Sequence, residues 1–190
     1  MSNNNPKALD AFAQQLHVKA TWEQVPLPPA ELAVLRQIVR DMKLRQPAGK
    51  RAVSQPIRGQ SGVVAIFDGP SGSARTMAAA ALAHDLGTNL YRVDLSAAVN
   101  KYIGETEKNL AQLFDQAERS QAILFFDEAD ALFGKRSEVK DTHGRYASLD
   151  VGYLLQRLET FNGLAILASN SRTQLDETFL RRIRYFVNIQ

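Results

Sequence analysis

Val63-Val64-Ala65-Ile66-Phe67 is an unbroken apolar run, and Asp68-Gly69-Pro70-Ser71-Gly72-Ser73-Ala74-Arg75-Thr76 follows it as a loop rich in glycine and serine. An apolar run without polar alternation is typical of a strand that is buried on both faces of a sheet. The alanine-rich segment Thr76–Leu86 predicts a helix, with Gly87 as its C-terminal cap. The order of strand, loop and helix therefore predicts a parallel α/β fold with a phosphate-binding loop.

Strands and helices continue to alternate along the rest of the chain. Apolar runs predict further strands at Leu90–Asp94, Ala122–Phe126, Leu164–Ala168 and Tyr185–Ile189. Apolar residues at helical spacing predict helices at Glu105–Arg119 and Leu149–Phe161. We therefore expect a three-layer α/β/α sandwich around a five-stranded parallel sheet, with the ligand at the carboxyl ends of the strands.

The segment before this alternation is expected to be an N-terminal arm over residues 1–21, followed by one domain over residues 22–190. Within the arm, the asparagine-rich N-terminus predicts partial disorder, and Ala8–Val18 has the apolar spacing of a short helix. Trp22–Leu27 reads as extended, and Pro28 and Pro29 suit the start of a helix that runs to about Arg45.

The composition fits a globular domain. The 190 residues are 45% hydrophobic and 23% charged, with no cysteine and a formal net charge of +3. No apolar run approaches the roughly 20 residues that cross a bilayer, and the polar N-terminus lacks the apolar region of a signal peptide. We therefore expect a cytoplasmic protein that has no disulfide framework and binds neither nucleic acid nor a membrane.

The loop matches the phosphate-loop motif only in part. The motif is Gly-x-x-x-x-Gly-Lys-Ser/Thr, and the chain has Ala74 and Arg75 where the second glycine and the lysine belong. Arginine keeps the charge, but its planar, forked group is longer than a lysine ammonium. We expect weak ATP binding and poor hydrolysis, and an ordinary turn between strand and helix is the alternative. The expected nucleotide-binding residues are Gly69, Pro70, Ser71, Gly72, Ser73, Ala74, Arg75, Thr76 and Met77.

Two carboxylates, Asp127 and Glu128, follow the apolar run Ile123-Leu124-Phe125-Phe126. Adjacent charges at the end of a buried strand are costly without partners. A Mg²⁺ ion held by Thr76 and Asp127, and a water activated by Glu128, would be such partners. The alternative is the start of a helix, where acidic residues are favoured.

Two longer blocks resemble AAA ATPases. They are Lys101-Tyr102-Ile103-Gly104-Glu105-Thr106-Glu107-Lys108-Asn109 and, after the acidic pair, Asp130-Ala131-Leu132-Phe133-Gly134-Lys135-Arg136. The resemblance runs from about Trp22 to the end of the chain, and is nearest to the bacterial AAA ATPases that accompany phage-tail-like contractile injection systems. It implies a homohexameric ring that uses ATP and Mg²⁺ to remodel a polypeptide client, with injection-system components as further partners.

The resemblance also implies roles for single residues. Lys101, Tyr102, Ile103 and Gly104 match a pore loop whose aromatic residue grips the client. Asn170 matches the residue that orients the attacking water, and Arg181 or Arg182 matches the arginine that reaches the neighbouring subunit's phosphate, with Arg182 favoured. Without the resemblance, Tyr102 reads as a half-buried loop aromatic, Asn170 as a turn residue and the arginines as surface. The family's small helical lid is not expected within this sequence, which stops at Gln190 just after the fifth strand; either the sequence is part of a longer protein or the protein lacks the lid.

We therefore expect an ATP-hydrolysing core of a ring-forming, protein-remodelling ATPase with a degenerate phosphate loop. The alternative is a non-hydrolysing structural or regulatory subunit with weak or no nucleotide binding, which Arg75 and the missing lid favour. A third hypothesis, remodelling of nucleic acid, is disfavoured by the mild charge.

Overall fold

The computed structural model describes residues 13–45, 62–70, 72–93, 106–127, 129, 152–170, 180–181 and 183–189. Its centre is a sheet of six strands in the order β1-β3-β4-β5-β2-β6. The strands are β1 (Ala13–Leu16), β2 (Val63–Asp68), β3 (Leu90–Val93), β4 (Ile123–Phe126), β5 (Leu164–Ser169) and β6 (Tyr185–Asn188). All neighbouring pairs are parallel except the edge pair of β1 and β3.

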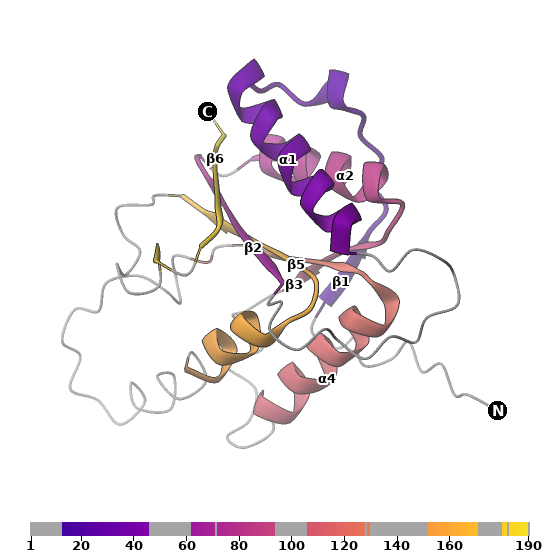
Figure 1. Cartoon of the computed structure of the whole chain (residues 1–190), viewed down its shortest axis with the longest axis vertical. Coiled ribbons are helices and arrows are strands. Elements are labelled where there is room, and N and C mark those ends of the chain that lie inside the picture. The colour runs from indigo at the N-terminus through magenta and orange to yellow at the C-terminus, as the bar shows by residue number, and fades with distance from the viewer. Residues whose placement is uncertain are drawn as a thin grey trace.

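Helices cover both faces of this sheet. Figure 1 shows α1 (Pro29–Arg45) and α2 (Ser73–Leu86) on one side, and α4 (Thr106–Ser120) with the helix at residues 152–160 on the other. Each pair of helices packs with its face of the sheet into a separate apolar cluster. The predicted three-layer α/β/α sandwich is therefore confirmed.

The strand β2 illustrates why its sequence shows no polar alternation. Val63, Ala65 and Phe67 face the cluster under α1 and α2. Ile66 and the partly buried Val64 face the cluster under α4. Because both faces are covered, every position along the strand favours an apolar side chain.

Two expectations for the N-terminal part are wrong. Residues 13–16 lie within the segment that was expected to be helical, but they form β1, which pairs antiparallel with β3 and makes the sheet six-stranded. The glutamines of this short segment carry no strong local preference, so pairing with an existing sheet edge decides its conformation. The segment expected to be extended from residue 22 begins as a 3₁₀ turn, Trp22–Gln24.

Acidic residues fasten α1 to its neighbours. Asp85 on α2 accepts hydrogen bonds from Trp22 Nε1 at 2.9 Å and from Lys43 Nζ at 2.7 Å. Asp41 on α1 accepts a hydrogen bond from the Tyr185 hydroxyl at 2.7 Å and pairs with Arg184 at 2.6 Å. The Tyr185 hydrogen bond and the nearby Arg184 charge hold the pKa of Asp41 below its usual value. Figure 1 shows α1 in front of α2 on the same side of the sheet.

Candidate functional site

The carboxyl ends of three neighbouring strands form one edge of the sheet. In the order β4-β5-β2, the strands run parallel, so their C-terminal residues share that edge. The following segments are also joined, because Gly69 N donates to Ser169 O at 3.1 Å and Ala129 N donates to Ala168 O at 2.9 Å. The segment after β2 and that after β4 are thus both bound to the end of β5, which is where parallel α/β folds bind ligands.

Gly69 is confined at the start of the loop. Its φ of 154° is a conformation that residues with a Cβ atom rarely adopt. A Cβ atom there would lie 1.8 Å from the carbonyl oxygen of Ile189 at the end of β6. The chain can therefore pass between β5 and β6 at this point only because the residue is glycine.

The helix α2 begins directly after the loop without a side-chain cap. Gly72 occupies the N-cap position with φ 167°, which is extended backbone, and as a glycine it makes no side-chain capping hydrogen bond. The first N–H groups of a helix have no partner within the helix and attract anions. The N-terminus of α2 therefore offers donors at the ligand-binding edge of the sheet.

Arg75 lies in the first turn of α2 and is only 3% exposed. Its two guanidinium contacts within the described residues are long: Nη1 donates to Gly69 O at 3.3 Å, and Nη2 lies 3.5 Å from Asp127 Oδ1. A buried charge usually needs shorter hydrogen bonds than these. An anion close to Arg75 would improve the hydrogen bonding of its guanidinium.

Arg75, Asp127 and Arg92 on β3 form a cluster of charged side chains. The sequence analysis missed Arg92. Its Nη2 donates to Asp127 Oδ2 at 2.6 Å, while half of the Arg92 side chain remains exposed. Asp127, which directly follows β4, thus meets Arg75 at one oxygen and Arg92 at the other. The one sequence signal for this role was an arginine in β3, the strand beside the one that Asp127 follows, but Arg92 belongs to no motif.

The predicted Mg²⁺ ligands within the described residues, Asp127 and Thr76, are not arranged to hold the ion. Each carboxylate oxygen of Asp127 already contacts a guanidinium group, and a cation at either oxygen would meet a like charge. Thr76, the other predicted ligand, is half-buried in α2. Within the described ranges, no three His, Asp or Glu side chains are grouped so that they could hold a metal ion.

The remaining predicted residues divide into two groups. Asn170 is exposed and directly follows β5, so it shares the edge with Gly69 and Asp127. Arg181 is exposed and precedes β6. Because β6 runs parallel to β2, its N-terminal end lies beside the N-terminal end of β2, where Arg184 N donates to Val64 O at 3.1 Å. This is the edge of the sheet opposite to the phosphate loop. Five residues from Val64 to Gly69 span roughly 16 Å of strand. Arg181 therefore lies away from the phosphate loop of its own chain.

Several predicted residues fall outside the described ranges. These are Ser71, Lys101, Tyr102, Ile103, Gly104, Glu128 and Arg182. Pro70 and Ser73 are exposed in or beside the loop, while Ala74 and Met77 are half-buried in α2.

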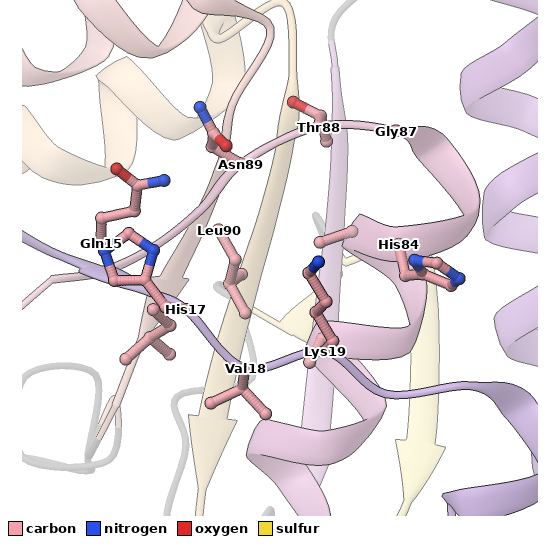
Figure 2. Close-up of a pocket in the computed structure, with 12 residues that line it drawn as sticks. Gln15, His17, Val18, Lys19, His84, Gly87, Thr88, Asn89 and Leu90 are labelled. Carbon is pink, nitrogen blue, oxygen red and sulfur yellow. The ribbon is translucent and has the colours of Figure 1, made fainter.

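A cavity of about 320 Å³ lies outside this group of residues, toward the C-terminal end of α2. It is lined by the segment 15–19, the C-terminal half of α2 and the residues that lead into β3 (Figure 2). The 14 residues of α2 separate its two ends by about 20 Å. None of the predicted site residues lines this cavity, so it is not part of the candidate site.

Comparison with known proteins supports the resemblance to the AAA family. The model of the family described as "ATPase family associated with various cellular activities (AAA)" matches residues 65–190. The chain is 28% identical to the AAA family ATPase y4kL of Sinorhizobium fredii over 181 residues, which is 93% of this chain and 52% of the relative. It is 31% identical to a probable 26S proteasome regulatory subunit 10B of Caenorhabditis elegans, over 80% of this chain and 37% of the relative.

The fold matches a solved structure as well. The crystal structure of the FIGL-1 AAA domain in complex with ADP superimposes with a TM-score of 0.69 at 21% identity, covering 100% of this chain and 63% of that one. At this identity the likeness shows the fold alone. The chain spans about half the length, or less, of the curated relatives it matches.

Proposed function

Because this chain belongs to the AAA family of ATPases, we propose that its loop binds ATP as the core of a ring-forming ATPase that remodels other proteins. One observation carries the proposal: α2 begins uncapped at the ligand-binding edge, directly beside the buried guanidinium of Arg75. Phosphate oxygens accept hydrogen bonds from both kinds of donor. The family match and the fold agree with this assignment.

ATP titration by calorimetry tests the binding step. We expect a saturable isotherm for the wild-type chain. Arg75→Met keeps an unbranched buried side chain but removes the charge, and it should weaken binding by roughly 10- to 100-fold, the effect of losing one charged hydrogen bond. Arg40→Met is the matched control, because Arg40 is exposed on α1. Equal ATP affinity in the Arg75 and Arg40 variants would contradict the proposal.

For hydrolysis, we propose Glu128 as the base and Asn170 as the group that orients the attacking water. The opposite-edge position of Arg181 supports action of Arg181 or Arg182 on a neighbouring chain rather than on its own nucleotide. Glu128→Gln should abolish phosphate release while leaving ATP affinity within about twofold. Unchanged phosphate release in that variant would remove Glu128 from this role.

A non-hydrolysing regulatory subunit is the second candidate function, and the Arg75–Asp127–Arg92 cluster favours it. These arginines engage the carboxylate that would otherwise hold Mg²⁺. Phosphate release on the sample used for titration separates the two candidates. Binding with release supports the enzyme, whereas binding without release supports the regulatory subunit.

For the assembly, we propose a homohexamer that threads a polypeptide client past Tyr102, in the cytoplasm and alongside components of a contractile injection system. Its support is the family resemblance and a relative named as a proteasome regulatory subunit. None of the helices in the described part of the chain has the length and apolarity of a membrane span. Light scattering with and without ATP tests the ring, and a monomer under both conditions would contradict it for this chain.

A further inference from the structure

The cluster around Asp127 has an unusual balance of charge for a nucleotide site. Among the described residues, two guanidinium groups, from Arg75 and Arg92, contact the one carboxylate of Asp127, so these three side chains together carry a formal net charge of +1. Arg92 makes the shorter contact, at 2.6 Å, and Arg75 makes the longer one, at 3.5 Å. Of these two arginines, Arg92 is therefore the closer partner of Asp127, and Arg75 is the one that is less tightly engaged with it.

The geometry points to a nucleotide site that works without a divalent cation. We propose that Arg75 binds the phosphates directly while Arg92 neutralises Asp127, so that ATP binds without Mg²⁺. This inference rests on the proposed function, since it concerns how the same loop holds its nucleotide. The occupant is a nucleoside triphosphate in its metal-free form.

Two features of Arg75 support its direct contact with the phosphates. Arg75 is 3% exposed and fixed in the first turn of α2, so its charge is already desolvated and preorganised beside the loop. Its contacts of 3.3 and 3.5 Å exceed the 2.7–2.9 Å typical of a guanidinium with an anionic oxygen. A phosphate oxygen would therefore offer Arg75 a stronger partner than either present contact.

Arg92 has a separate task in this arrangement. An unneutralised carboxylate beside the loop would repel the phosphates of a metal-free nucleotide. Arg92 prevents this by pairing with Asp127, and it does so from an exposed position on β3. Replacing Arg92 should restore the need for a metal ion without disturbing the buried core.

The test is titration of the 190-residue chain with ATP in two buffers, one with excess Mg²⁺ and one with EDTA. We expect the two dissociation constants to agree within about threefold, less than 1 kcal/mol. A loss of at least about tenfold in EDTA would overturn the inference while leaving the proposed function intact. No binding in either buffer would overturn the proposed function and this inference with it.

Variants and a metal titration make the test sharper. Arg92→Ala should bind ATP at least about tenfold more tightly with Mg²⁺ than with EDTA, because Asp127 then loses the positive charge of its closer arginine. The exposed Arg40→Ala should keep the wild-type agreement between buffers. Mn²⁺, followed by its paramagnetic resonance signal, should not bind the nucleotide-free wild-type chain. Metal-independent binding by Arg92→Ala, or Mn²⁺ binding by the wild type, would overturn the assignment.

Discussion

Gly69 provides the sharpest stability prediction, because its surroundings are backbone atoms that cannot rotate away. Replacing Gly69 with alanine would place a Cβ atom 1.8 Å from Ile189 O, where ordinary contacts begin at 3.4 Å, so the two must separate by about 1.6 Å. Ile189 is buried, and its N–H donates to Asp68 O at 2.6 Å. Relieving the clash therefore means opening the junction of β2 and β6.

The cost can be worked from these contacts. Holding a residue with a Cβ atom at φ 154° costs about 1–3 kcal/mol. Loss of the hydrogen bond between Ile189 and Asp68 adds about 1 kcal/mol, and displacement of packed neighbours adds about 1–3 kcal/mol. We expect Gly69→Ala to lower the free energy of unfolding by about 3–5 kcal/mol in all, since the terms overlap. In a chain of this length the melting temperature should fall by roughly 6–20 °C.

The assay is thermal and denaturant unfolding followed by the fluorescence of Trp22, the single tryptophan, which packs against the core. Gly72→Ala is the matched control, because its φ of 167° is extended and an added Cβ meets no atom within 4 Å. That variant should change stability by less than about 1 kcal/mol. Equal stability of the Gly69 and Gly72 variants would refute the role assigned to the Gly69 contact.

Two further predictions concern the packing around the sheet. Asp41→Asn should lower the free energy of unfolding by about 2 kcal/mol at neutral pH, because it loses charge-assisted bonds to Tyr185 and Arg184. The folded pKa of Asp41 is lowered, so this stability is present above its unfolded pKa of about 3.9 and is lost as the pH falls through the folded pKa. A difference in free energy of unfolding between variant and wild type that stays constant down to pH 2 would contradict this prediction. Phe114→Ala should cost about 3–5 kcal/mol in urea unfolding, because Phe114 is fully buried against Phe161 with ring centroids 5.2 Å apart. Leu44→Ala, at a side chain that is 84% exposed, is its control and should differ from wild type by less than about 0.5 kcal/mol.

The central strands could be predicted from sequence because their burial leaves a simple pattern. Every residue of β4 and β5 is buried, and the corresponding apolar runs were placed to within one residue at each end. The C-terminal cap of α2 was predictable for a different reason: Gly87 has φ 65°, a conformation that favours glycine. In these segments local preference and tertiary packing agree.

The strand β1 shows where such agreement ends. Gln14 and Gln15 suit a helix at least as well as a strand, and the apolar spacing around them fits a helix. The segment is extended because its backbone pairs with β3, which is 74 to 80 residues away in the chain. No pattern within 11 residues contains that information, so the sixth strand could not be predicted.

In the candidate site, some features follow from the local sequence and others depend on tertiary packing. The altered phosphate-loop motif must be interpreted with both. The sequence analysis placed Arg75 in the loop and began the helix at Thr76, whereas α2 begins at Ser73 and Arg75 lies in its first turn; only the charge of Arg75 followed from its identity. Its partners did not follow, because they depend on the burial of the guanidinium and on the register that brings Arg92 beside the end of β4. Taken alone, the change from lysine to arginine predicts a weakened site. Taken with Asp127 and Arg92, it describes a site whose charges are balanced differently, and binding with and without a metal ion distinguishes these two interpretations.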